Sequence, residues 1–282
     1  MKVVMLIPAL MLENNRKANH AAMQYAKEHY HIDEFVVNDA EYLDTDYEEG
    51  FTYIGHHAER QGFVRTRNQL LEWFYNSDAD YAVWLDANAK VTKGSLNDMN
   101  TLIDAAKAGK IEVDAVFSTL GINISGERIA AKKMPDYFEN VYLTKFEGGY
   151  DWLHGMMIKN FKKYYGTEIY IDDRCDPHKG TSEDIYFARM MKRLFDVRLC
   201  PTITVSKPSN KTSTWVADKS GYKYPKVDNA TVDAYIEENV KAKNLQPRPK
   251  TTKTYKLPRG ESYISLLKPY KPRQRRKARG LI

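Results

Sequence analysis

The stretch from Tyr81 to Asn88, YAVWLDAN, constrains the fold of this chain more than any other. Its first five residues are mostly apolar, which is typical of a strand buried on both faces of a parallel sheet. Asp86 and Asn88 follow where that strand ends, and open α/β sheets bind their ligands beyond the carboxyl ends of their strands. The two side chains could hold a hard divalent cation and, through it, a diphosphate. The alternative is a strand that ends in an Asx-type turn.

Length and composition indicate a globular protein. The 282 residues are enough for one large α/β domain or two small ones. No apolar run approaches the ~20 residues of a membrane helix, and the apolar N-terminus is too short for a signal peptide. Cys175 and Cys200 make no disulfide framework. We therefore expect a cytoplasmic protein without a membrane partner.

The formal charge of +6 is concentrated at the C-terminal end. Twelve of the 43 Lys and Arg residues, but only one acidic residue, lie from Arg248 onward, whereas the first 247 residues hold 31 basic and 36 acidic residues. Such a segment favours a polyanionic partner, and the alternative is a solvated terminus. The cations expected to bind such a partner are Arg273, Arg275, Arg276, Lys277 and Arg279.

Apolar runs alternate with amphipathic segments over the first two hundred residues. Strands are predicted over 3–9, 34–38, 81–85, 113–120, 169–173 and 197–205. Helices are predicted over 14–30, 62–74, 95–108, 182–194 and 231–243. Residues 39–60 are expected to form an irregular loop, 121–150 an insertion that shapes a pocket, and Pro201 an edge or a bulge. The resulting division is a core over 1–206, a helical part over 207–248 and a basic tail over 249–282.

Two predicted helices begin with polar residues that could be functional. Arg65, Arg67 and Asn68 stand where a helix start favours anions, although both arginines could instead be solvated or paired with acids. Glu183 and Asp184 follow the possible N-cap Ser182. Acids are favoured at this end of a helix, so capping alone would also explain them.

In their order, these segments resemble glycosyltransferases of the GT-A fold. The matching elements are Ile7-Pro8-Ala9 at the end of the first strand, Arg-Thr-Arg-Asn at 65–68, the 86–88 motif in place of the family's DxD, a Gly-containing aromatic segment at 148–155, and Ser-Glu-Asp at 182–184. The resemblance covers about residues 2–206. It implies an α/β fold, with a Rossmann-like mixed sheet flanked by helices, followed by a basic C-terminal extension. In size and basic tail the chain is most similar to T-even phage transferases of the β-glucosyl-HMC-α-glucosyltransferase type, which act on hydroxymethylcytosine DNA.

The resemblance also implies a role for each matching residue. The expected donor-binding residues are Pro8, Ala9, Arg65, Arg67, Asn68, Asp86, Trp152, His154 and Lys207. Asp86 and Asn88 would hold Mg²⁺ or Mn²⁺ on the UDP diphosphate. Asp184 stands where inverting members carry the catalytic base, with Glu183 directly before it. Such transfer needs a carboxylate that takes the acceptor hydroxyl's proton.

Two positions depart from the family pattern. The second ligand of the DxD motif is the neutral Asn88, and no His follows His178, although the family often has a late His that binds the metal. Lys207 stands near that place. Either Lys207 supplies the positive charge, or the metal is held by fewer protein ligands.

The function that these features imply is transfer of glucose from UDP-glucose to glucosylated hydroxymethylcytosine in double-stranded DNA. The reaction would proceed with inversion, form a gentiobiosyl group and take place in the host cell cytoplasm. One alternative is transfer of another sugar, such as arabinose, to hydroxymethylcytosine DNA. Another is a non-catalytic, basic nucleic-acid-binding protein in which the acidic residues only cap helices and turns.

Overall fold

The computed structural model describes residues 1–11, 13, 15–40, 43, 46–57, 62–87, 89–91, 93–120, 139–145, 155–175, 182–206 and 227–259. Its strands are β1 (Val3–Leu10), β2 (Glu34–Ala40), β3 (Thr52–His57), β4 (Tyr81–Trp84), β5 (Lys90–Val91), β6 (Ala115–Leu120), β7 (Asn140–Lys145), β8 (Met156–Lys159), β9 (Val197–Ser206) and β10 (Tyr255–Pro258). Its helices are α1 (Arg16–His29), α2 (Phe63–Asn76), α3 (Lys93–Lys107), α5 (Phe161–Tyr165), α6 (Glu183–Leu194) and α7 (Asn229–Ala242).

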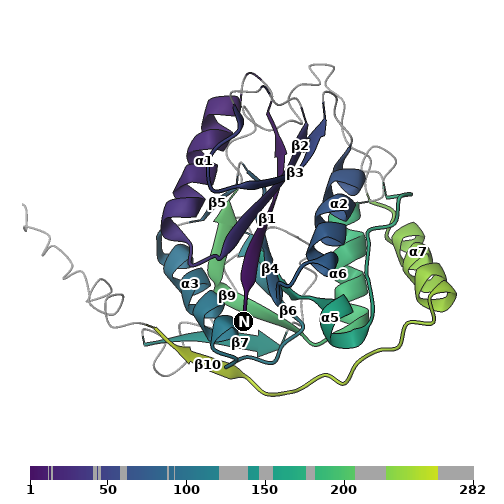
Figure 1. Cartoon of the computed structure of the whole chain (residues 1–282). Coiled ribbons are helices and arrows are strands. Elements are labelled where there is room, and N and C mark those ends of the chain that lie inside the picture. The colour runs from purple at the N-terminus through teal and green to yellow at the C-terminus, as the bar shows by residue number, and fades with distance from the viewer. Residues whose placement is uncertain are drawn as a thin grey trace, which may run out of the picture.

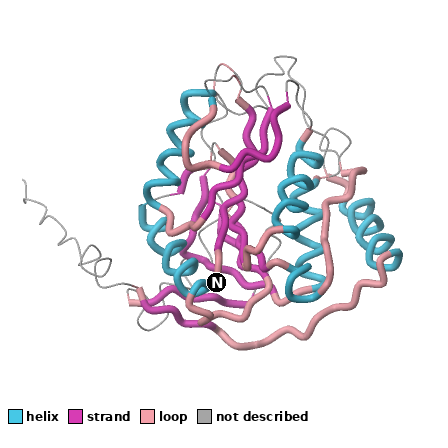
Figure 2. Tube along the Cα trace, in the orientation of Figure 1, coloured by secondary structure: helices cyan, strands magenta, loops and turns pink. Residues whose placement is uncertain are grey.

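The described strands form one mixed sheet in the order β10-β7-β9-β6-β8-β4-β1-β2-β3, with β5 paired to β9. Strands β1 to β4 run parallel to one another, and β8 lies antiparallel between β4 and β6. Helices α1 and α3 cover one face of the sheet, and α2, α5 and α6 cover the other, with α7 outside them (Figures 1 and 2). This α/β architecture confirms the predicted fold class.

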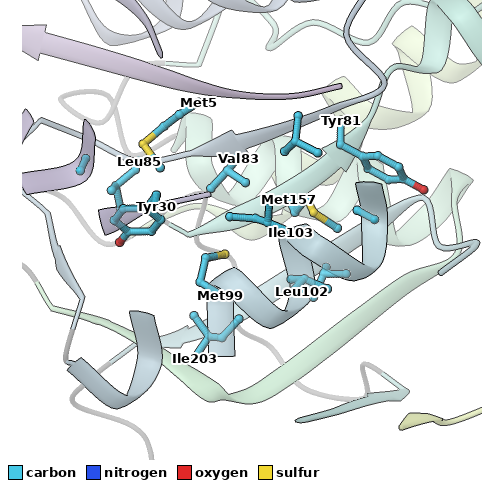
Figure 3. Packing of buried hydrophobic residues seen from close by; sticks show 14 of the residues in the cluster. Met5, Tyr30, Tyr81, Val83, Leu85, Met99, Leu102, Ile103, Met157 and Ile203 are labelled. Atoms are coloured by element: carbon cyan, nitrogen blue, oxygen red, sulfur yellow. The ribbon is translucent and has the colours of Figure 1, made fainter. Parts of the chain in front are cut away.

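Both faces of the central strands are buried, as the apolar runs predicted. Along β1, Met5 packs toward α1 and α3, whereas Leu6 packs toward α2 and α6. Figure 3 shows Met99 and Ile103 of α3 close to Val83 of β4 on the first of these faces. Each such side chain stabilises the fold by about 2 kcal/mol, and the central strands are therefore fixed from both sides.

Several sequence-based expectations were wrong in detail. The supposed loop over 39–60 contains β3, and the supposed insertion over 121–150 contains β7. Residues 169–173 form no strand, although their apolar members are buried. Of the two alternatives for Pro201, the bulge is confirmed, because the β6–β9 register shifts beside it, whereas β9 is an interior strand and not an edge.

The start of the supposed basic tail belongs to the sheet. β10 pairs antiparallel with β7 and buries Tyr255 and Leu257. Beyond it, the guanidinium of Arg259 donates to both carboxylate oxygens of Asp98 on α3, at 2.7 and 2.9 Å. Residues 255–259 are therefore part of the folded core. In the described part of the chain, no helix combines the length and the apolar character needed to cross a membrane.

Candidate active site

Asp86 lies beyond the carboxyl end of β4, next to the end of β1. The amide of Leu85 donates to Leu6 O at 3.1 Å, and that of Ala87 to Pro8 O at 3.2 Å. These bonds extend the β1–β4 pairing past the strand and hold Asp86 beside Pro8. The sequence predicted this placement, because parallel strands end at the same edge of a sheet.

Arg67, from α2, is the centre of the site. Its Nη1 donates to Oε1 of Glu183 at 3.0 Å and, more closely, to Oδ1 of Asp184. Its Nη2 lies 3.6 Å from Oδ1 of Asp86. We call these four residues the Arg67 cluster. It joins the end of β4 to the first turn of α6, two segments about a hundred residues apart in the sequence.

The surroundings of Arg67 keep its guanidinium in place. Its side chain is only 3% exposed, and its Cζ lies 5.7 Å from the ring of Trp84 and 6.0 Å from that of Phe63, where cation–π attraction is favourable. The amide of Asn38, on β2, donates to Thr66 O at 2.9 Å and so ties α2 to the sheet just before Arg67.

Two factors set the pKa values in the cluster: its burial, and the excess of three carboxyl groups over one guanidinium. Burial disfavours the cation of Arg67, but the carboxylates of Asp184, Glu183 and Asp86 outweigh that effect and raise the pKa of Arg67. Burial, together with the charge of Asp184, raises the pKa of Glu183 to about 7, although Arg67 opposes the shift. Three carboxyl groups thus surround one guanidinium, and Glu183 can hold a proton near neutral pH. A carboxyl with such a pKa is suited to acid–base chemistry.

The first turn of α6 also favours the two acids. Glu183 and Asp184 are its first residues, and the N-terminal end of the helix dipole stabilises negative charge there. The side chain of Ser182, the predicted cap, makes no capping hydrogen bond. Both carboxyl groups reach Arg67 instead, so capping alone does not account for them.

The other predicted residues of the α2 start lie elsewhere. Asn68 uses both ends of its amide on the backbone of Ile171, at 2.8 Å each, and so fixes the 169–173 segment to α2. Arg65 is exposed. Arg65 and Asn68 line a cavity of about 690 Å³ beside residues 170–173 and α7. Arg67, the weaker of the predicted nucleotide contacts, is instead the one that meets the acids.

Several predicted site residues lie outside the described residues. They are Asn88, Trp152, His154, Lys207 and the five tail cations Arg273, Arg275, Arg276, Lys277 and Arg279. Gly155, directly after His154, is described: its amide donates to Trp84 O at 2.7 Å and its φ is +70°. A Cβ there would lie 2.6 Å from Cγ2 of Val205, so this position requires glycine.

The described residues give limited support for the predicted Mg²⁺ or Mn²⁺ site. Of the predicted ligand pair only Asp86 is described, and its carboxylate faces Arg67. Within the described ranges, no three His, Cys, Asp or Glu side chains gather in a way that could hold a metal ion.

The sequence matches no known protein-family profile and no curated protein. The fold, however, is similar to that of S. aureus TarS 1–349 in complex with UDP-GlcNAc, with a TM-score of 0.54 and 15% identity over 85% of this chain. A weaker likeness is to S. aureus TarS 1–349 in complex with UDP, with a TM-score of 0.45 and 17% identity over 73% of this chain and 60% of that one. Another is to Rv0371c from Mycobacterium tuberculosis H37Rv, with a TM-score of 0.43 and 9% identity over 84% of this chain and 98% of that one.

The chain spans 66% of the TarS chain that holds UDP-GlcNAc. At 15% identity the likeness concerns the fold alone. Together with the mixed sheet and its flanking helices, it confirms the expected GT-A-like α/β fold.

Proposed function

We propose that this protein is a glycosyltransferase that takes its sugar from a UDP-sugar donor. The observation that carries the proposal is the Arg67 cluster, in which three carboxyl groups meet one buried guanidinium beyond the end of β4. Open α/β sheets bind ligands at this edge. A UDP-sugar bound to the similar fold of TarS supports the donor class.

In this proposal the two sides of the cluster have different tasks. Asp86 lies beside Pro8 on the donor side. Asp184, on α6, acts as the general base and takes the proton of the acceptor hydroxyl as that oxygen attacks the anomeric carbon. The bond from the anomeric carbon to the diphosphate breaks on the opposite face, which gives inversion. Glu183 adjusts the charge beside the base.

A divalent cation held by Asp86 and Asn88 would supply positive charge to the departing diphosphate. Asp86 is the only one of these two residues that is described. The steps assigned to this chain's own residues therefore do not pass through such an ion.

The proposed acceptor is glucosylated hydroxymethylcytosine in double-stranded DNA, and the proposed donor is UDP-glucose. The basic C-terminal end supports a DNA partner, because Lys and Arg neutralise phosphates without reading sequence. Residues 248–255 lie near Met1 and Tyr81, at the N-terminal ends of β1 and β4 and thus far from the Arg67 cluster. The 23 residues from 260 onward could span roughly 75 Å if extended. DNA held by them could therefore still reach the cluster.

The direct test is transfer of labelled glucose from UDP-glucose to three DNAs: unmodified, hydroxymethylated and already glucosylated. We expect label only on the glucosylated DNA. Label on hydroxymethylated DNA alone would keep the enzyme class and change the acceptor. UDP-arabinose in parallel tests the donor, and binding of UDP without transfer from either donor would overturn the proposed reaction.

The role of Asp184 has its own test. Asp184→Asn should lower kcat by roughly 10²- to 10⁴-fold, the usual contribution of a general base, and leave UDP affinity nearly unchanged. The matched control is Asp233→Asn. Asp233 is an exposed acid on α7, and it pairs with Arg189, which lies on α6 like Asp184. Turnover within a few-fold of the unaltered protein would contradict the assignment.

A further inference from the structure

Arg67 links two parts of the site through different nitrogen atoms. Nη1 serves the α6 side, where Glu183 and Asp184 lie, and Nη2 faces Asp86 at the end of β4. The side chains of Glu183 and Asp184 are 5% and 10% exposed, and that of Asp86 is 17% exposed. The carboxyl groups that contact Nη1 of Arg67 are thus more deeply buried than the carboxylate of Asp86 that faces Nη2.

We infer that Arg67 is a positioning residue, whose guanidinium fixes the carboxylate of Asp184 relative to that of Asp86. The inference rests on the proposed function, in which these carboxylates serve acceptor and donor. Arg67 itself takes no proton and forms no bond in the reaction. Its effect is geometric, since it sets the distance between the general base and the donor side.

The chemistry of arginine suits this role and that of lysine does not. A guanidinium is planar and presents several N–H donors in a fixed fork, so that two of its nitrogens can meet two carboxylates at once. A lysine ammonium is a single point on a flexible stem. The ring centroids of Trp84 and Phe63 lie 5.7 and 6.0 Å from Cζ of Arg67, where cation–π attraction also favours the guanidinium.

Stability alone is a poor reason for the cluster. Buried ion pairs lose about as much in desolvation as they gain in attraction, and apolar replacements are often as stable. Here three carboxyl groups lie around one buried guanidinium, and all of these groups lose hydration when the cluster forms. The Nε of Arg67 is buried with no hydrogen-bond partner among the described residues, which adds a further cost. A site that retains such costs is better explained by the geometry it secures.

The test compares Arg67→Lys with Arg193→Lys, which alters an arginine on α6 that pairs with Glu237 at the surface. Circular dichroism and thermal unfolding first establish that both variants are folded at the assay temperature. We expect Arg67→Lys to lower kcat roughly 10²-fold, the typical effect of a 1 Å misplacement, with KM and UDP affinity changed less than about 3-fold. Arg193→Lys should leave kcat unchanged.

A double-mutant cycle separates positioning from a structural role. If Arg67 acts through Asp184, Arg67→Lys combined with Asp184→Asn should be no slower than Asp184→Asn alone. The pH profile of kcat/KM should also shift in Arg67→Lys, because Glu183, Asp184 and Asp86 all face the altered cation. Multiplicative losses, an unmoved pH profile, or a folded Arg67→Lys with kcat within 3-fold would each overturn the inference.

A failure of the proposed function can be told apart from a failure of this inference. If the unaltered protein transfers no sugar, the proposed function fails. The positioning role is then tested by crystal structures of both variants. In Arg67→Lys the carboxylate of Asp184 should be displaced relative to that of Asp86, whereas in Arg193→Lys the two should keep their places. Unmoved carboxylates in Arg67→Lys would overturn the inference.

Discussion

Replacing Glu183 by Gln should change how the stability of this protein depends on pH. The carboxyl group of Glu183 is buried, accepts a hydrogen bond from Arg67 at 3.0 Å and has a pKa raised to about 7 by burial and by Asp184. Gln has nearly the same shape and keeps an oxygen that can accept this bond, but it carries no charge at any pH. The variant therefore removes the titration of Glu183 and little else.

The magnitude follows from the two pKa values of Glu183. Below its ordinary pKa of 4.5 the group is protonated in both the folded and the unfolded chain and contributes nothing to pH dependence. Between pH 4.5 and about 7 the unfolded chain loses the proton and the folded chain keeps it, so the free energy of unfolding falls as pH rises. Above about 7 the loss is complete, and the difference between the two pKa values corresponds to about 3 kcal/mol.

The assay is urea unfolding at several pH values from about 4 to about 8, for the unaltered protein, Glu183→Gln and the control Glu28→Gln. Glu28 is an exposed acid on α1, and its replacement should change the free energy of unfolding by less than about 0.5 kcal/mol at every pH. Relative to the unaltered protein, Glu183→Gln should gain about 3 kcal/mol between the acidic and the alkaline end. A difference that stays constant with pH would refute the reasoning, because Glu183 would then titrate alike in both states.

Three further predictions concern the frame around the site. Gly155→Ala should lower the free energy of unfolding by about 2–4 kcal/mol, because it forces a side chain into left-handed backbone and against Val205; a change below about 0.5 kcal/mol in urea unfolding would contradict this. Arg259→Met should cost about 3–5 kcal/mol, because it leaves Asp98 buried without its partner, and an unchanged melting temperature would be evidence against it. Deleting 260–282 should preserve the fold and UDP affinity but lower the salt dependence of DNA binding by up to about six in the log–log slope, given seven cations; an unaltered slope would show that DNA is bound elsewhere.

The sequence predicted the central strands and one end of the site because their signals are local. β1 and β4 are apolar on both faces, so their burial can be recognised without knowing their neighbours. Asp86 follows β4 directly, and its place at the strand's end follows from the chain itself. The acidic start of α6 was recognised for the same reason.

The short strands could not be predicted in this way. β8 has only four residues, and its antiparallel place between β4 and β6 depends on pairings with distant segments. β10 lies in a Lys-rich segment and buries only alternate residues against β7. Neither strand carries enough local pattern to be distinguished from a loop.

Within the Arg67 cluster, too, some features follow from local sequence and others depend on contacts between distant segments. In the sequence, Arg65 and Arg67 are equivalent cations at a helix start, although Arg67 lies at helical spacing from the buried Leu70, Leu71 and Phe74. That spacing is a signal that could have distinguished the two, because a cation on an apolar face needs a buried partner. The sequence by itself thus determined the central strands β1 and β4, the long helices and the polar residues at their ends. Only the tertiary structure decided that Arg67 turns inward to meet the acids of α6, because that contact depends on how α2 and α6 pack on the sheet.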